Sequence, residues 1–267
     1  MSALPNALAL KRADSIERLW LLGLVTPAML LIVITMVLPV GWLFYLSLLS
    51  DTGAFTTEHY VRMWEQPSYF RTFRTTFEVS IMTTAICLVI GYPLAYFLSE
   101  LPKRAANLCM IAVLLPLWTS LLVRTYAWLV LLQRKGLINN WAIELGLWTE
   151  PIALVHNMLG TLIGTVHVML PFLILPLYSS MRAIDRNYLR AAANLGASPM
   201  KTFWSVFFPL AMPGMATGAL IVFILCLGFY ITPAVLGGGK VIMVSSRIAN
   251  DIEIFFNWGA ASALGVV

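Results

Sequence analysis

The sequence has 267 residues, of which 60% are hydrophobic and only 11% are charged. Soluble domains carry about 25% charged residues, so a chain of this composition has too few polar groups to cover a globular surface. We therefore expect an integral membrane protein, and the net charge of +5 does not indicate nucleic-acid binding.

Five apolar runs are long enough to cross a bilayer, which takes about 20 helical residues. They cover residues 19–49, 76–98, 107–132, 151–178 and 207–235. The first run exceeds the apolar core of a secretory signal, about 7–15 residues, so it is expected to remain as a span. A further run ends at Val267 and is too short to span, so we expect a sixth helix that has been cut off. The predicted fold class is all-α, a polytopic helical membrane protein.

Basic residues are distributed unequally between the polar segments. With residues 1–18 placed in the cytoplasm, the inner segments hold nine cations against four acids and the outer segments hold seven against eight. The positive-inside rule favours this orientation. It makes 1–18 a cytoplasmic segment, 19–267 a transmembrane domain, and 180–206 a cytoplasmic loop within that domain.

A polar segment at 185–209 (here the corner segment) interrupts the apolar sequence. Asp185 is suited to cap a helix, because its carboxylate accepts free N–H groups of the first turn. Gly196 is suited to end that helix in a left-handed conformation. Ser198 and Pro199 then fit the N-cap and first position of a second helix. Two short helices joined by a sharp corner are predicted, forming a docking surface for a partner.

The corner segment resembles the EAA loop of type I binding-protein-dependent ABC importers. The family pattern is Glu-Ala-Ala, three residues, Gly, nine residues, an aliphatic residue, one residue, and Leu-Pro. The residues at this spacing are Ala191, Ala192, Gly196, Val206 and Pro209, with Phe208 in the leucine place and Arg190 in the glutamate place. The resemblance implies coupling helices that sit in a groove of a cytoplasmic ATPase. Because Arg190 departs from the pattern, a salt bridge made by the family's glutamate would not carry over.

A second resemblance covers most of residues 76–262. The segments 91–96, 115–128, 136–139, 170–180 and 257–261 are similar to those of spermidine/putrescine permeases. This branch implies a small, cationic amino compound as substrate, delivered by a periplasmic binding protein. It further implies a bacterial inner-membrane location, an ATPase dimer that holds ATP and Mg, and a second, related permease. The chain itself is then expected to catalyse no chemistry and to bind no cofactor, metal or nucleic acid.

Seven residues near span ends or in outer segments are candidates for the substrate pathway, because acids and aromatic rings attract ammonium groups. Arg124 is placed roughly 26 Å into the third span at 1.5 Å per residue, near the outer interface, so a structural role that lets it reach water is the alternative. For Asp251 and Glu253, the alternative to a place in the pathway is that they are solvated loop residues that meet the binding protein. The candidates are Glu78, Trp118, Arg124, Tyr126, Trp128, Asp251 and Glu253.

The sequence also gives expectations for two glycine pairs, for His167 and for rival functions. The pairs Gly160/Gly164 and Gly214/Gly218 have a spacing that allows helices to approach closely. His167 is expected to serve packing or hydrogen bonding rather than metal binding. The rival functions are a secondary transporter or channel without an ATPase, for which inverted repeats and midplane ions would be typical, and a membrane scaffold.

Overall fold

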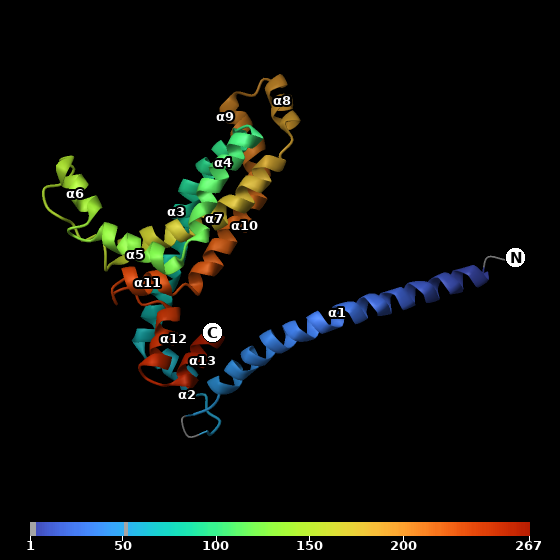
Figure 1. Ribbon diagram of the computed structural model, residues 1–267, viewed down its shortest axis with the longest axis horizontal. Coiled ribbons are helices and arrows are strands. Elements are labelled where there is room, and N and C mark those ends of the chain that lie inside the picture. The colour runs from blue at the N-terminus through green and yellow to red at the C-terminus, as the bar shows by residue number, and fades with distance from the viewer. Residues whose placement is uncertain (1–3, 51–52) are drawn as a thin grey trace. The chain divides into compact units, whose positions relative to one another are not determined.

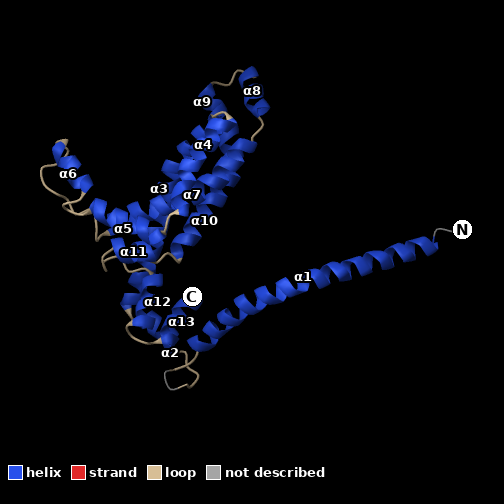
Figure 2. Ribbon diagram, viewed as in Figure 1, coloured by secondary structure: helices blue, strands red, loops and turns tan. Residues whose placement is uncertain are grey.

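The computed structural model describes residues 4–50 and 53–267, with side chains for residue 17 and from residue 19 onward. Every regular element in these ranges is a helix (Figure 2), which confirms the all-α prediction. Four described helices are long and apolar enough to cross a membrane, and a fifth crossing is obtained if one bent pair counts as a single span. The spans are Leu19–Ser47, Pro67–Glu100, Met158–Ala183 and Pro199–Leu227, and the bent pair is Lys103–Trp118 with Leu121–Glu144. The chain is therefore a multi-pass membrane protein.

The backbone divides into two compact units, one of residues 1–62 and 251–267 and the other of residues 63–250. In the first unit, α1 (Leu4–Ser47) packs against α13 (Trp258–Val266), whose residues from Gly259 to Leu264 are small or apolar and buried. Gly259 lies directly against the imidazole of His59, and the Nε2 atom of His59 is 2.9 Å from the carbonyl oxygen of Leu49. Glycine is required at this approach because a side chain at 259 would overlap the histidine ring.

The second unit is built on three helices that pack side by side (Figure 1), namely α3 (Pro67–Glu100), α7 (Met158–Ala183) and α10 (Phe208–Leu227). Leu173, Ile174 and Leu177 of α7 are fully buried between the neighbouring helices. The other elements of this unit are α4 (Lys103–Leu114), η1 (Leu115–Trp118), α5 (Leu121–Leu132), α6 (Leu137–Glu144), α8 (Arg186–Asn194), α9 (Pro199–Thr202), η2 (Phe203–Phe207) and α11 (Ile231–Leu236). The residues of α12 (Val244–Glu253) are divided between the two units, and so are those of α2 (Glu58–Glu65).

The close helix packing predicted for the small-residue pairs is confirmed for three of the four glycines, whereas Gly160 lies against the backbone of Leu154 and Val155 in the preceding loop. Gly164 of α7 lies against Thr232 and Leu236 of α11. Gly214 and Gly218 of α10 lie against α7, where Gly214 meets Ser180 and Gly218 meets the backbone of Leu173. These glycines allow the helix backbones to approach more closely than larger residues would permit.

Gly218→Ala is expected to destabilise the protein. A Cβ atom at 218 would lie 2.9 Å from the carbonyl oxygen of Leu173, so α10 and α7 must separate, at a cost of about 1–3 kcal/mol for an overpacked contact. The matched control is Gly23→Ala in α1, where a Cβ atom meets nothing within 4 Å and alanine favours the helix. Thermal unfolding in detergent should show a lower Tm for the first variant only. An equal Tm for Gly218→Ala and the parent would contradict the packing argument.

The third predicted span is not continuous, which corrects the sequence analysis. The helix pair that replaces it is bent by 95° between Trp118 and Leu121. Pro116 cannot donate a backbone hydrogen bond, and Thr119 and Ser120 adopt non-helical backbone conformations (ψ 149° and 133°), so the helix cannot pass through them. The residues on both sides of the break are apolar, so the mean hydropathy of the region does not reveal it.

The other spans also have boundaries that differ from the predicted ones. The second span begins at Pro67 rather than 76, because the helix extends beyond its apolar part. The fourth begins at Met158, where the side chain of Asn157 accepts a hydrogen bond from the N–H of Gly160. The fifth ends at Leu227, before Gly228, and the polar residues that follow include α12. Residues 51–52 of the first outer loop lie outside the described residues.

Candidate functional site

The corner segment folds as its capping residues predict. Asp185 caps α8, its carboxylate accepting from the N–H of Asn187 at 2.9 Å. Gly196 ends that helix with a φ of +83°, in the left-handed region. Ser198 then caps α9, accepting from the N–H of Lys201 at 3.4 Å, with Pro199 at the first helical position. Each turn of this corner is therefore determined by local sequence.

The two short helices of the corner leave large apolar side chains in contact with solvent. No residue of α8 or α9 is buried. Leu195 is 89% exposed and Met200 68% exposed, and Tyr188 and Trp204 are also exposed. Apolar side chains gathered on an exposed surface are typical of a site that binds a partner.

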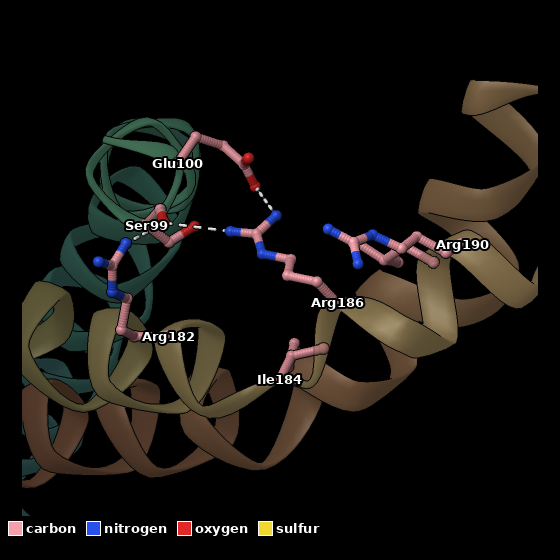
Figure 3. Close-up of a pocket in the computed structure, with 7 residues that line it drawn as sticks. Ser99, Glu100, Arg182, Ile184, Arg186 and Arg190 are labelled. Carbon is pink, nitrogen blue, oxygen red and sulfur yellow. Dashed lines mark hydrogen bonds and ion pairs between the residues drawn. The ribbon is translucent and has the colours of Figure 1, made fainter. Parts of the chain in front are cut away.

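Two arginines, one at the end of α7 and one at the start of the corner segment, contact the C-terminal end of α3 (Figure 3). Arg182, in the last turn of α7, donates from Nη1 to the carbonyl oxygens of Ser99 at 2.7 Å and of Leu101 at 2.9 Å. Arg186, at the start of α8, donates from Nη2 to the carbonyl oxygen of Ser99 at 3.1 Å and forms an ion pair with Glu100. The last carbonyls of a helix have no partner within it and carry partial negative charge, so cations stabilise them. We call this set of contacts the arginine latch.

Aromatic rings form a second attachment between the corner and α3. Phe203 and Phe207 lie in η2, a π-helical turn between α9 and α10, and their rings stack at 5.8 Å. Tyr96 of α3 packs edge-on against both, at 5.5 and 5.1 Å, and Tyr92 packs against Phe208 at 5.7 Å. π-Helical turns inside α-helices are frequent at functional sites.

The other residues of the resemblance follow one another along this region. Ala191 is exposed and Ala192 half-buried on α8, while Val206 is half-buried in η2 and Pro209 is exposed at the start of α10. Arg190 is exposed on α8 and lines a pocket of about 550 Å³ together with both latch arginines. The sequence analysis missed the latch, for which the available signal was a pair of arginines four residues apart directly after a span.

The pathway candidates of the second unit occupy different environments. Glu78 of α3 is half exposed and pairs with Arg74 at 2.7 Å. Trp118 and Tyr126 are exposed, whereas Trp128 is half-buried and donates from its indole nitrogen to Nδ1 of His167 at 3.1 Å. The hydrogen-bonding role expected for His167 is therefore confirmed.

The depth predicted for Arg124 does not hold, because it assumed an unbroken third span. Arg124 lies on α5, after the 95° bend. Its Nε and Nη1 atoms are buried and have no hydrogen-bond partner among the described residues.

The remaining two candidates belong to the first unit. Asp251 and Glu253 end α12 rather than standing in a loop, which corrects their predicted setting. Asp251 is only 3% exposed, whereas Glu253 is exposed.

Residues 24–267 match the family of binding-protein-dependent transport system inner membrane components. The chain belongs to this family. The permease is 36% identical over 211 residues to the spermidine/putrescine transport system permease protein PotB of Haemophilus influenzae, covering 79% of this chain and 73% of that one. It is 34% identical over 212 residues to PotB of Escherichia coli, covering 79% and 77%.

The fold of the permease is also that of a solved importer. It matches a crystal structure of a bacterial ABC transporter involved in the import of the acidic polysaccharide alginate, with a TM-score of 0.75 and 16% identity over 96% of this chain and 92% of that one. At this identity the likeness shows the fold alone. The family confirms the resemblance drawn from the motifs, and the chain is a transport subunit rather than an enzyme.

Proposed function

We propose that this permease imports a small cationic amino compound of the polyamine class into the cytoplasm of a bacterium, across the inner membrane. The proposal is supported by its identity of about one third to two spermidine/putrescine permeases. The compound would arrive on a periplasmic binding protein that meets the outer segments. A second, related permease would complete the pathway, and residues 1–18 would lie in the cytoplasm.

The observation that carries the coupling part of the proposal is the exposed corner segment. Its helices are fixed by local caps and present Leu195 and Met200 to solvent. We infer that they sit in a groove of an ATPase subunit. The residues near the contact would be Arg190, Ala191, Ala192, Gly196, Val206, Phe208 and Pro209. ATP and Mg would be bound by a dimer of that ATPase, and its movements would reach the spans through this segment.

The pathway would run past acidic and aromatic side chains. In the second unit, we propose that Glu78 supplies negative charge and that the aromatic residues Trp118, Tyr126 and Trp128 supply ring faces for an ammonium group. In the first unit, we propose that Asp251 and Glu253 supply negative charge. Arg124 is proposed to line the path as well.

The decisive test is uptake by the whole importer, purified from its native membrane and placed in lipid vesicles. We expect uptake of labelled spermidine that requires ATP and the binding protein and is competed by putrescine but not by a neutral sugar. Glu78→Gln should raise the half-saturating spermidine concentration roughly fivefold, as loss of one partly exposed charge contact predicts. Uptake without ATP would favour a secondary transporter, and unchanged half-saturation would remove Glu78 from the pathway.

A further inference from the structure

The pocket beside α8 has an uncompensated positive charge. Its lining carries three arginines, Arg182, Arg186 and Arg190, against a single acid, Glu100. Glu100 is already paired with Arg186, and Arg182 donates to the carbonyls that end α3. The guanidinium of Arg190 points into the same pocket toward Arg186 (Figure 3). Two neighbouring guanidinium groups repel each other unless an anion lies between or beside them.

Arg190 differs from the two latch arginines in having no internal partner. Neither a hydrogen bond nor an ion pair of Arg190 occurs within the described part of the chain, and the residue is exposed. An arginine on a surface needs no partner in itself, but this one lies on a helix that also exposes Tyr188 and is followed by the 89% exposed Leu195. A cation framed by exposed apolar side chains is typical of the centre of a protein interface, where arginine and aromatic residues are enriched.

We propose that Arg190 and this pocket receive a carboxylate, from an aspartate or glutamate side chain of the ATPase subunit. The guanidinium fork of Arg190 matches a carboxylate with two parallel hydrogen bonds, and the charge of Arg186 adds to the attraction. The docking contact then has its cation on the permease side and its anion on the ATPase side. The inference rests on the proposed docking function of the corner and specifies the chemistry of its partner.

The proposed carboxylate contact would also affect the arginine latch. A carboxylate seated between Arg190 and Arg186 would lie close to the Arg186–Glu100 pair, which holds α8 to α3. Binding of the ATPase would therefore place its own charge next to the contact that joins the corner to a membrane span. The pocket is thus both a docking site and the point where a movement of the ATPase can enter the span.

The experiment uses the ATPase subunit that co-purifies with the wild-type permease from its native membrane. Its affinity is measured for the permease in nanodiscs of neutral phosphatidylcholine. We expect Arg190→Glu to weaken binding about tenfold or more. Arg190→Lys should weaken it less, because lysine keeps the charge and loses only the second hydrogen bond of the guanidinium fork. The matched control is Arg134→Glu, another exposed arginine without a partner in the described contacts, which should bind as the wild type does.

A charge exchange completes the test. The facing acid is located by cross-linking from Arg190→Cys and is changed to lysine, which should restore binding to the Arg190→Glu permease. Equal binding by wild type and Arg190→Glu would overturn the carboxylate proposal and leave the docking function standing. A weakening seen only in nanodiscs that contain phosphatidylglycerol would overturn it in favour of a lipid headgroup. Failure of the wild type to bind any ATPase would instead refute the proposed function itself.

Discussion

Arg186→Ala is expected to uncouple ATP hydrolysis from uptake while the ATPase stays bound. Arg186 joins α8 to α3 through its ion pair with Glu100 and its hydrogen bond to the carbonyl of Ser99. The exposed apolar side chains of the corner and Arg190 remain after the loss of these bonds, so docking is weakened but survives. Loss of one charged hydrogen bond and one half-exposed ion pair should lower uptake per ATP hydrolysed roughly fivefold or more. Uptake and phosphate release are measured together in vesicles.

Two further variants show whether the latch itself is responsible. Glu100→Gln keeps a side-chain oxygen that can accept from Arg186 but removes the charge, so it should have a smaller effect in the same direction. Arg104→Ala removes an exposed cation of α4, which follows directly on the end of α3, and should leave the coupling ratio unchanged. If Arg186→Ala released the ATPase completely, the loss of uptake would reflect failed docking, and transmission through the latch would be wrong.

Sequence reasoning succeeded where structure depends on adjacent residues. The caps at Asp185 and Ser198 and the left-handed turn at Gly196 are each determined by a residue and its next few neighbours. Long apolar runs similarly identified four helices of spanning length, because hydropathy over about 20 residues is a direct measure of membrane compatibility. The family and the substrate class came from resemblance, and neither could be obtained from periodicity or charge.

Sequence reasoning failed where distant segments meet. The latch joins residues 83 positions apart, Arg182 and Ser99, and nothing in either local sequence specifies the other. The break at Thr119 and Ser120 was missed for a different reason. Proline is tolerated within many membrane helices, so Pro116 alone does not reveal whether a span continues or turns. In this chain the following two residues leave the helical conformation, and the span is broken.

Gly196→Pro is expected to abolish docking of the ATPase and to reduce ATP-dependent uptake to less than about one-tenth. Proline fixes φ near −65°, whereas Gly196 has a φ of +83°, and it removes the N–H that donates to the carbonyl of Ala193 at 2.9 Å. Proline also disfavours the helical backbone of the preceding residue, Leu195 (φ −82°, ψ 8°). The corner segment must therefore change its conformation, and the orientation of α8 relative to α9 is no longer fixed.

Gly146, in another loop, provides a matched control for the Gly196→Pro substitution. Gly146 ends α6 with a φ of +69°, donates to the carbonyl of Ile143 at 3.0 Å, and follows Leu145 in nearly the same conformation (φ −79°, ψ −2°). Gly146→Pro should cause a similar local strain and a similar change in Tm, yet retain the ATPase. If both variants lost uptake equally, the loss would reflect damage to folding. If only Gly196→Pro did so while its Tm matched that of Gly146→Pro, the corner would be required for coupling independently of its contribution to stability.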